Sequence, residues 1–192
     1  MKANLRERNV PERILRSAYG CIAQKGYANV SLRDIAENAG VALSQLHYYY
    51  KNKEGLLLAV VRMATGEYVS GAERRLQEAG TPREKWDRFL NYFKGLLRER
   101  PEEFRLLFDL VSMSLWNAKL KSLLGGLFLQ LSELLKTYVL TESRTSPKFR
   151  GVSPDAAARS AVSSVFGTAM QYVLNPRDTT LLESIGCIEL PV

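Results

Sequence analysis

The chain has 192 residues, 46% of them hydrophobic and 24% charged, which is the composition of an ordinary soluble globular protein. The formal net charge of +7 is uneven: residues 1–62 hold ten Lys or Arg against five Asp or Glu, and residues 63–192 hold seventeen against fifteen. A local basic excess suits phosphate neutralisation on nucleic acid, although a modestly basic terminus also occurs without such a role.

The two cysteines, Cys21 and Cys187, lie far apart in the sequence and match no metal-ligand spacing. Both have apolar neighbours, which favours small buried thiols, so we expect no metal and no cofactor. The N-terminal residues MKANLRERN are polar and do not resemble a signal peptide. The longest apolar run, Leu123–Leu131, is too short to cross a bilayer. These features predict a cytoplasmic protein with no membrane partner.

The first expected helix follows residues 1–9, a basic arm that could contact nucleic acid but is more often merely solvated. Pro11 suits the first turn of a helix. Apolar residues then recur at helical spacing as far as Lys25-Gly26, which predicts one amphipathic helix.

The segment Ser31–Lys53 predicts two short helices joined by a tight turn. Ser31 can cap the first helix, with Asp34 in the capping-box position three residues later. Gly40 ends that helix, because a residue without a Cβ adopts positive φ at the least cost. Two such helices around a glycine turn form a helix-turn-helix, whose second helix enters the major groove of DNA. The residues expected to be structural are Leu32, Ile35, Leu46, Tyr49 and Tyr50.

Downstream, a fourth helix is expected after Asn52, with an apolar stripe that can run to Ala79. Gly80-Thr81-Pro82 is the clearest boundary, since Thr81 can cap the next helix with Pro82 in its first turn. Pro101 predicts the start of a sixth helix.

A seventh, leucine-rich helix contains the pair Gly125-Gly126, which predicts a kink or a local break. Residues 141–152 are polar and predict a loop. Ser153-Pro154 opens an eighth helix with small residues on one face, and Thr180–Ile188 forms the last helix. With no β pattern and no internal repeat, the sequence predicts an all-α fold of about nine helices.

Four runs carry a resemblance to a known family: SLRDIA (31–36), AGVA (39–42), LHYYY (46–50) and NKEGL (52–56). They resemble the N-terminal DNA-binding domain of TetR-type (TetR/AcrR) bacterial transcriptional regulators. The resemblance implies a three-helix helix-turn-helix domain, residues 1–63, followed by a helical effector-binding and dimerisation domain, residues 64–192. The second of these regions carries no motif of the family.

The helical period turns Ser44, Gln45 and Tyr48 outward, with His47 beside them. Gln45 can bond adenine through N6 and N7. With the contacts that the resemblance implies, the predicted DNA-binding residues are Ser31, Arg33, Ala42, Ser44, Gln45, His47, Tyr48 and Lys53. Many members of the family have Ser or Thr where this chain has Ala42, so the recognition helix lacks its usual cap.

The resemblance also implies a homodimer that binds a double-stranded DNA operator and leaves it when a small-molecule effector binds. The candidate pocket residues are Phe104, Phe108, Met113, Trp116, Phe128, Tyr138, Met170 and Tyr172. Because little charge surrounds them, an apolar effector is expected, although aromatic stripes at helical spacing are more often core than pocket. The candidate dimer residues are Ala157, Ser160, Ala161, Ser164, Gly167, Thr168, Leu181, Leu182 and Ile185.

Two other classes of function compete with a repressor, and activation in place of repression also stays open. An all-helical enzyme is disfavoured because the chain has one histidine and no HExxH, glycine-rich phosphate loop or Cys/His cluster. A protein-interaction or membrane-surface module would use the basic N-terminal part. Neither alternative requires the order of residues in Ser31–Lys53, so we expect a DNA-binding regulator and no enzyme.

Overall fold

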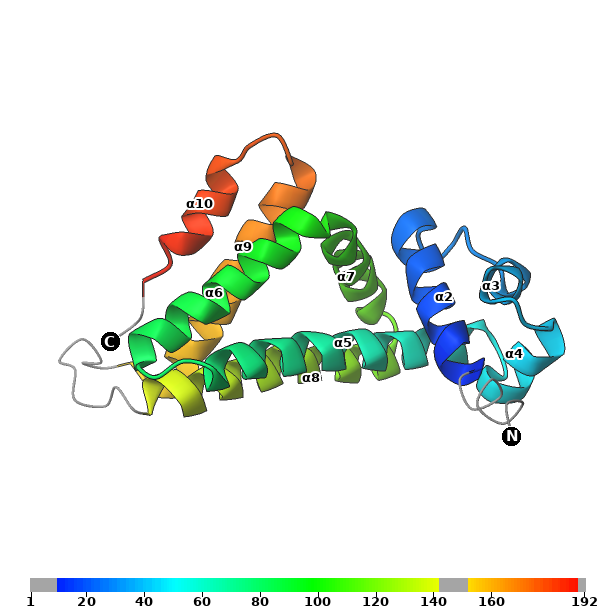
Figure 1. Ribbon diagram of the computed structural model, residues 1–192, viewed down its shortest axis with the longest axis horizontal. Helices are drawn as coiled ribbons and strands as arrows, with labels where there is room; N and C mark the ends of the chain where they lie inside the picture. The colour runs from blue at the N-terminus through cyan, green and yellow to red at the C-terminus, as the bar shows by residue number, and fades with distance from the viewer. Residues whose placement is uncertain (1–9, 142–151, 190–192) are drawn as a thin grey trace. The chain divides into compact units, whose positions relative to one another are not determined.

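The computed structural model describes residues 10–141 and 152–189, and these residues contain α-helices and one π-helical turn but no strand. The predicted arm, residues 1–9, and most of the predicted loop lie outside the described residues. The all-α prediction is confirmed, and the described part of the chain has the nine expected α-helices (Figure 1). In chain order the elements are α2 (Val10–Lys25), α3 (Leu32–Ala39), α4 (Leu43–Tyr50), α5 (Lys53–Gln77), α6 (Pro82–Glu99), α7 (Pro101–Ser114), α8 (Ala118–Leu135), the π-helix η1 (Lys136–Leu140), α9 (Pro154–Leu174) and α10 (Thr180–Gly186).

Three predicted helix starts are confirmed by their hydrogen bonds. Ser31 and Thr81 each form a complete capping box, with Asp34 and Glu84 respectively. Ser153 caps α9 by accepting a hydrogen bond from the Ala156 N–H. A cap satisfies backbone donors that a helix start would otherwise leave unpaired, which explains why short sequence signals located these starts correctly.

The predicted break at Gly125-Gly126 is wrong, since α8 runs through both glycines and the irregular turn comes later, at η1. The leucines on one side of α8 are buried, and this burial stabilises the helix enough to offset the low helix propensity of glycine. The segment Ala118–Leu140 also has the length and mean hydropathy, 1.3, of a membrane span, although its longest apolar run is short. However, its one face of buried leucines is what a core helix of a globular protein has; these are Leu120, Leu124, Leu127, Leu131 and Leu135.

The contacts divide the described chain into two compact units. The first contains residues 10–65 and 109–123, and the second contains residues 66–108, 124–141 and 152–189. The sequence placed a boundary near residue 63 but did not anticipate that residues 109–123 group with the first unit. As a division into functional domains, the boundary stays a prediction.

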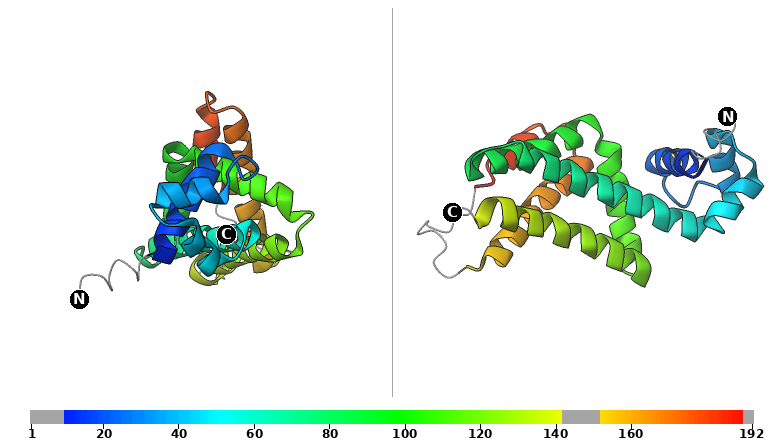
Figure 2. Two further views of the ribbon diagram at one scale, coloured as in Figure 1. Left: turned by 90° about the vertical axis from the view of Figure 1, so that its right-hand side faces the viewer. Right: turned by 60° about the horizontal axis from the view of Figure 1, so that its bottom comes forward.

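In the first unit, α2 packs against both helices of the predicted helix-turn-helix, α3 and α4 (Figure 1). In the second unit, α6 packs against α9, α10 and η1, and α9 packs against α10 (Figure 2). The interior of the second unit is aromatic, with Phe166 of α9 at the centre of a ring cluster. Its ring centroid lies 5.5 Å from that of Phe93, 6.1 Å from that of Phe104 and 5.1 Å from that of Phe128.

Candidate nucleic-acid interface

The turn between α3 and α4 is fixed by backbone geometry and by one distant side chain. Gly40 ends α3 in the left-handed region, with φ of 62°, which glycine adopts without the cost that a Cβ imposes. The Nη2 of Arg13, on α2, donates to the carbonyl oxygens of Ala39 at 2.6 Å and Gly40 at 3.1 Å. A cation at the carbonyl end of a helix is also favoured by the helix dipole. Arg13 therefore clamps the turn that orients the second helix.

The start of α3 is held by a carboxylate and a hydroxyl group. The Asp34 carboxylate accepts hydrogen bonds from the Ser31 hydroxyl at 2.7 Å and from the Ser31 N–H at 2.9 Å. The Ser31 hydroxyl in turn accepts from the Asp34 N–H at 3.1 Å. The Ser31 hydroxyl, followed by the Ser31 N–H, holds the pKa of Asp34 below its usual value. Ser31, a predicted DNA contact, thus has its hydroxyl proton engaged within the cap.

This cap predicts an acid-dependent stability. Because the folded state lowers the pKa of Asp34, the carboxylate stabilises the fold above the unfolded value of about 3.9, and the effect is lost as pH falls through the folded value. We expect Asp34→Asn to melt at a lower temperature than the wild type at pH 7, with the difference shrinking below about pH 4. Circular dichroism melts from pH 7 to pH 2.5 would measure it, with Glu37→Gln on the same helix as the control. A difference that stays constant over this range would contradict the role of the carboxylate.

Helix α4 has one buried anchor and a broad exposed face. Leu46 is fully buried, whereas the side chain of Tyr48 is 80% exposed. Tyr48 packs edge-on against Tyr49, with ring centroids 5.1 Å apart, so the exposed ring is supported by its neighbour. The exposed residues of this face and of the cap before it are Ala42, Ser44, Gln45, His47, Tyr48 and Tyr49. This face contains every predicted recognition-helix contact.

The start of α4 is capped in an unusual way. Ala42 occupies the N-cap position in an extended conformation and has no side-chain oxygen to offer. The Oε1 of Gln45 instead reaches back and accepts a hydrogen bond from the Ala42 N–H at 3.2 Å. This is one half of a capping box, so the predicted lack of a cap is partly compensated by Gln45.

The end of α4 is a strained turn. Lys51 has φ of 63° and ψ of −56°, and the Asn52 N–H donates to the Tyr50 carbonyl oxygen at 2.7 Å, which is the geometry of a classic γ-turn. The Nδ1 of His47 lies 2.9 Å from the Lys51 carbonyl oxygen, and because a carbonyl only accepts, Nδ1 carries the proton. The Nε2 of His47 can therefore donate to a phosphate oxygen only when the ring is protonated.

Two tyrosines tie the recognition helix and α5 to the rest of the first unit. The Tyr50 hydroxyl donates to the Pro11 carbonyl oxygen at 2.8 Å, and burial raises the pKa of Tyr50. The Nζ of Lys53 lies 4.4 Å above the ring of Tyr27, and burial, followed by the charge of Glu54, raises the pKa of Tyr27. Tyr50 is therefore structural, as predicted. Lys53 is half-buried on an aromatic face, which fixes the direction of its ammonium group.

The eight predicted DNA-binding residues all lie in the first unit, on or beside α3, α4 and the start of α5. Sequence reasoning missed Arg13 and Tyr27, which position the site without belonging to its motif. No local signal identified them, because each acts on a residue at least 26 positions away in the chain.

The candidate pocket residues are less coherent as a group. Phe104, Phe108 and Phe128 belong to the ring cluster around Phe166, which the sequence analysis did not single out. The side chain of Trp116 is 92% exposed and Met170 is 46% exposed, so in this structure neither of them lines an interior cavity. Met113 is half-buried and belongs to the first unit, and Tyr172 is buried on α9. The Tyr138 hydroxyl donates to the Glu73 carboxylate at 3.1 Å and accepts from the Gln77 amide at 3.0 Å. Tyr138 therefore links η1 to α5.

The ring cluster reaches the surface at one groove between α8 and α9. This groove has a volume of about 450 Å³ and is lined by Phe128, Ser132, Arg159, Val162, Ser163 and Phe166. Two phenylalanines and a valine make its apolar part, and Arg159 is an exposed cation at its edge. Glu103, which the sequence analysis missed, is buried near the same cluster, 2.8 Å from Arg100 and 3.4 Å from the Tyr68 hydroxyl.

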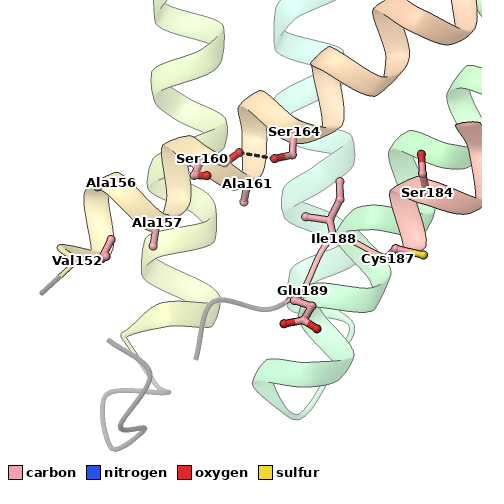
Figure 3. A pocket seen from close by; sticks show the side chains of 10 residues that line it. All are labelled: Val152, Ala156, Ala157, Ser160, Ala161, Ser164, Ser184, Cys187, Ile188 and Glu189. Atoms are coloured by element: carbon pink, nitrogen blue, oxygen red, sulfur yellow. Dashed lines mark hydrogen bonds between the residues drawn. The ribbon is translucent and has the colours of Figure 1, made fainter. Parts of the chain in front are cut away.

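The candidate dimer residues divide into two sets. Four of them are buried within this chain: Ala157, Ala161, Leu182 and Ile185. Ala157 and Ala161 nevertheless reach the wall of the pocket between α9 and the end of α10. Ser160 and Ser164 are exposed and line a pocket of about 470 Å³ between α9 and the end of α10 (Figure 3). Gly167 is exposed, and Thr168 and Leu181 are half-buried. Small residues occur on both sides of α9, so the choice of residues that meet a second copy stays a prediction. The exposed stripe of small and apolar residues is Ala156, Ser160, Ser163, Gly167, Met170 and Leu174.

The first unit therefore has the architecture of a helix-turn-helix DNA-binding domain, with a capped first helix, a left-handed glycine turn and an exposed recognition helix. Residues 14–60 match the family described as "Bacterial regulatory proteins, tetR family". The resemblance is confirmed for this N-terminal domain, over residues 14–60.

Individual relatives agree with this assignment. The fatty acid metabolism regulator protein of Bacillus subtilis (strain 168) is 33% identical over 72 residues, a match that spans 38% of this chain and 37% of that protein. Among solved structures, a TetR transcription regulator from Haloarcula marismortui is 21% identical with a TM-score of 0.81, covering 93% of each chain. The regulator FadR from Bacillus subtilis in complex with stearoyl-CoA is 20% identical with a TM-score of 0.76, covering 92% of this chain and 94% of that chain. These structural likenesses extend the shared fold to the C-terminal helices.

Proposed function

We propose that the protein is a homodimeric DNA-binding transcriptional regulator, acting as a repressor that a small molecule releases from its operator. The observation that carries the proposal is the exposed face of α4. The helix is anchored by the buried Leu46 in its middle, by the clamped turn before it and by Tyr50 at its end. An exposed helix with polar side chains and a rigid base suits insertion in the major groove. Arg33, at the start of α3, and Lys53, at the start of α5, would contact phosphates on either side.

Binding to DNA upstream of the protein's own gene tests the proposal. We expect a complex whose affinity falls linearly on logarithmic axes as salt increases, because Lys and Arg contacts release counterions. Fluorescence anisotropy from about 50 to 200 mM salt would measure the slope, and six or more phosphate contacts would weaken binding by roughly 10³-fold or more over this range. The double variant Arg33→Gln, Lys53→Gln should lower the slope by about 2. Binding that ignores salt, or no binding to any duplex, would contradict a DNA-binding function.

The effector proposed here is apolar or has a long apolar part. The support is the ring cluster of Phe104, Phe108, Phe128 and Phe166 and its opening beside Arg159. Burying apolar surface is the main favourable term for such a ligand. Stearoyl-CoA, which the similar FadR structure contains, is therefore the first ligand to test for release of bound DNA.

The dimer is proposed to form through the exposed stripe of α9 together with α10. Its residues recur at spacings of four and three, from Ala156 to Leu174, as in a helix seam. The small side chains from Ala156 to Gly167 allow close approach of a second helix, and Met170 and Leu174 add apolar surface. A symmetric contact buries the same stripe on both copies. We expect light scattering to give about twice the chain mass of 21.6 kDa, and Gly167→Arg to give the mass of one chain. A single-chain mass for the wild type would contradict the dimer.

A further inference from the structure

The hydrogen bond that caps α4 also determines what Gln45 can read on DNA. Gln45 is exposed at the third position of the recognition helix, where side chains face the groove. Its amide has one acceptor, Oε1, and one donor group, the Nε2 amine. The Ala42 N–H can bond only to an acceptor, so the observed contact at 3.2 Å identifies Oε1 as the atom turned back toward the protein.

This orientation is incompatible with a bidentate grip on adenine. That grip needs Oε1 to accept from N6 while Nε2 donates to N7, so both atoms must point toward the same base edge. With Oε1 directed at the Ala42 N–H, only Nε2 is available to the groove. An amine donor facing the adenine N6 amine would meet a second donor, which is unfavourable.

We propose that Gln45 acts as a donor-only reader that selects guanine, and next thymine, over adenine in each half-site. Guanine presents two adjacent acceptors, N7 and O6, which one amine can serve with its two hydrogens, and thymine presents O4. The selection originates at residue 42: with no capping oxygen of its own there, the cap falls to the Gln45 carbonyl. The inference rests on the proposed DNA-binding function and names which bases that function prefers.

Two substitutions separate the donor from the cap. Gln45→Glu keeps a carboxylate oxygen for the Ala42 N–H but has no donor. Ala42→Pro removes the N–H that holds Oε1, and the φ of Ala42, −69°, is the value that proline imposes. Gln24→Glu on α2 makes the same chemical change at another exposed position of the first unit and serves as the control.

The experiment is selection of bound sequences from a randomised double-stranded DNA library with the full-length protein and each variant. We expect the wild type and Gln24→Glu to enrich the same half-site, with guanine or thymine at one position favoured by about 5- to 150-fold. Gln45→Glu should lose that preference and move it to cytosine or adenine, which present an amino group. Ala42→Pro should gain adenine at the same position.

The outcomes distinguish the inference from the function on which it rests. If the wild type enriches no sequence and binds no duplex, the proposed function fails. The donor-only proposal is overturned if the wild type enriches a half-site in which Gln45→Glu changes the preferred base at no position. It is also overturned if the wild type itself prefers adenine at the position that Gln45 reads and Ala42→Pro keeps that preference. Circular dichroism melting shows whether Ala42→Pro is folded. If it is not, the Gln45→Glu selection decides alone.

Discussion

Replacing Phe166 by alanine should lower the free energy of unfolding by about 3–5 kcal/mol, the usual cost of removing a buried phenylalanine. The side chain is only 6% exposed and its ring contacts those of Phe93, Phe104 and Phe128 from α6, α7 and α8. Its loss would leave three rings facing an empty volume, since packed interiors relax only partially around a cavity. Urea unfolding followed by circular dichroism would measure the change.

Two further variants make the result specific to the ring cluster. Phe166→Leu fills most of the same volume and should cost much less than Phe166→Ala. Leu115→Ala removes a side chain that is 68% exposed and should change stability by less than about 0.5 kcal/mol. Equal losses for Phe166→Ala and Leu115→Ala would show that the cluster contributes little to stability.

The same substitution bears on the proposed effector site, because Phe166 also lines the groove beside Arg159. If an apolar effector binds between these rings, the alanine variant should alter the concentration of stearoyl-CoA needed to release DNA. If the groove is only a surface feature of the core, stability changes and the release concentration does not. The two readouts therefore separate a packing role from a ligand-binding role.

Local signals in the sequence identified the helices well because each signal satisfies its own backbone groups. Ser31 with Asp34, and Thr81 with Glu84, are complete within four residues, so their hydrogen bonds do not depend on the rest of the fold. The glycine pair at 125–126 does not break its helix, for the opposite reason. Helix propensity is a small local cost, and the buried leucines of α8 outweigh it through tertiary packing.

The sequence predicted the residues of the helix-turn-helix motif but not the side-chain contacts that hold the motif in place. The exposed face of α4 followed from helical period, because Leu46 has to be buried. The back-reaching Gln45 was missed because an alanine at the N-cap was interpreted as an absent cap, whereas half of a capping box needs only the backbone N–H. On α9, small residues on two sides of the helix left its exposed stripe ambiguous, and only the observed burial of Ala157 and Ala161 separates them.

Arg13 holds the turn before α4 through contacts that the sequence did not indicate. Its replacement should lower both the stability of the protein and its affinity for DNA. Arg13→Met deletes two hydrogen bonds from a charged donor to the carbonyl oxygens of Ala39 and Gly40, which should cost roughly 1.5–3 kcal/mol in total. Because those carbonyls form the turn that orients α4, DNA affinity should fall even though Arg13 is outside the predicted contact set. Chemical unfolding and anisotropy with the selected half-site would measure the two effects.

Loss of one positive charge would by itself weaken DNA binding, so the clamp has to be separated from the charge. Arg13→Lys keeps the charge but has a single ammonium group in place of the planar guanidinium that spans both carbonyls. Arg16→Met removes a charge one turn along α2, where the side chain is 59% exposed and pairs with Glu12 at 3.6 Å. If the clamp orients α4, Arg13→Lys should lower stability and DNA affinity but leave the salt dependence of that affinity as in the wild type. Arg16→Met should keep its stability but show a weaker salt dependence of DNA affinity. Should Arg13→Lys match the wild type in both stability and affinity, the turn is held by its glycine geometry alone. Arg13 would then be one more basic side chain near the phosphates.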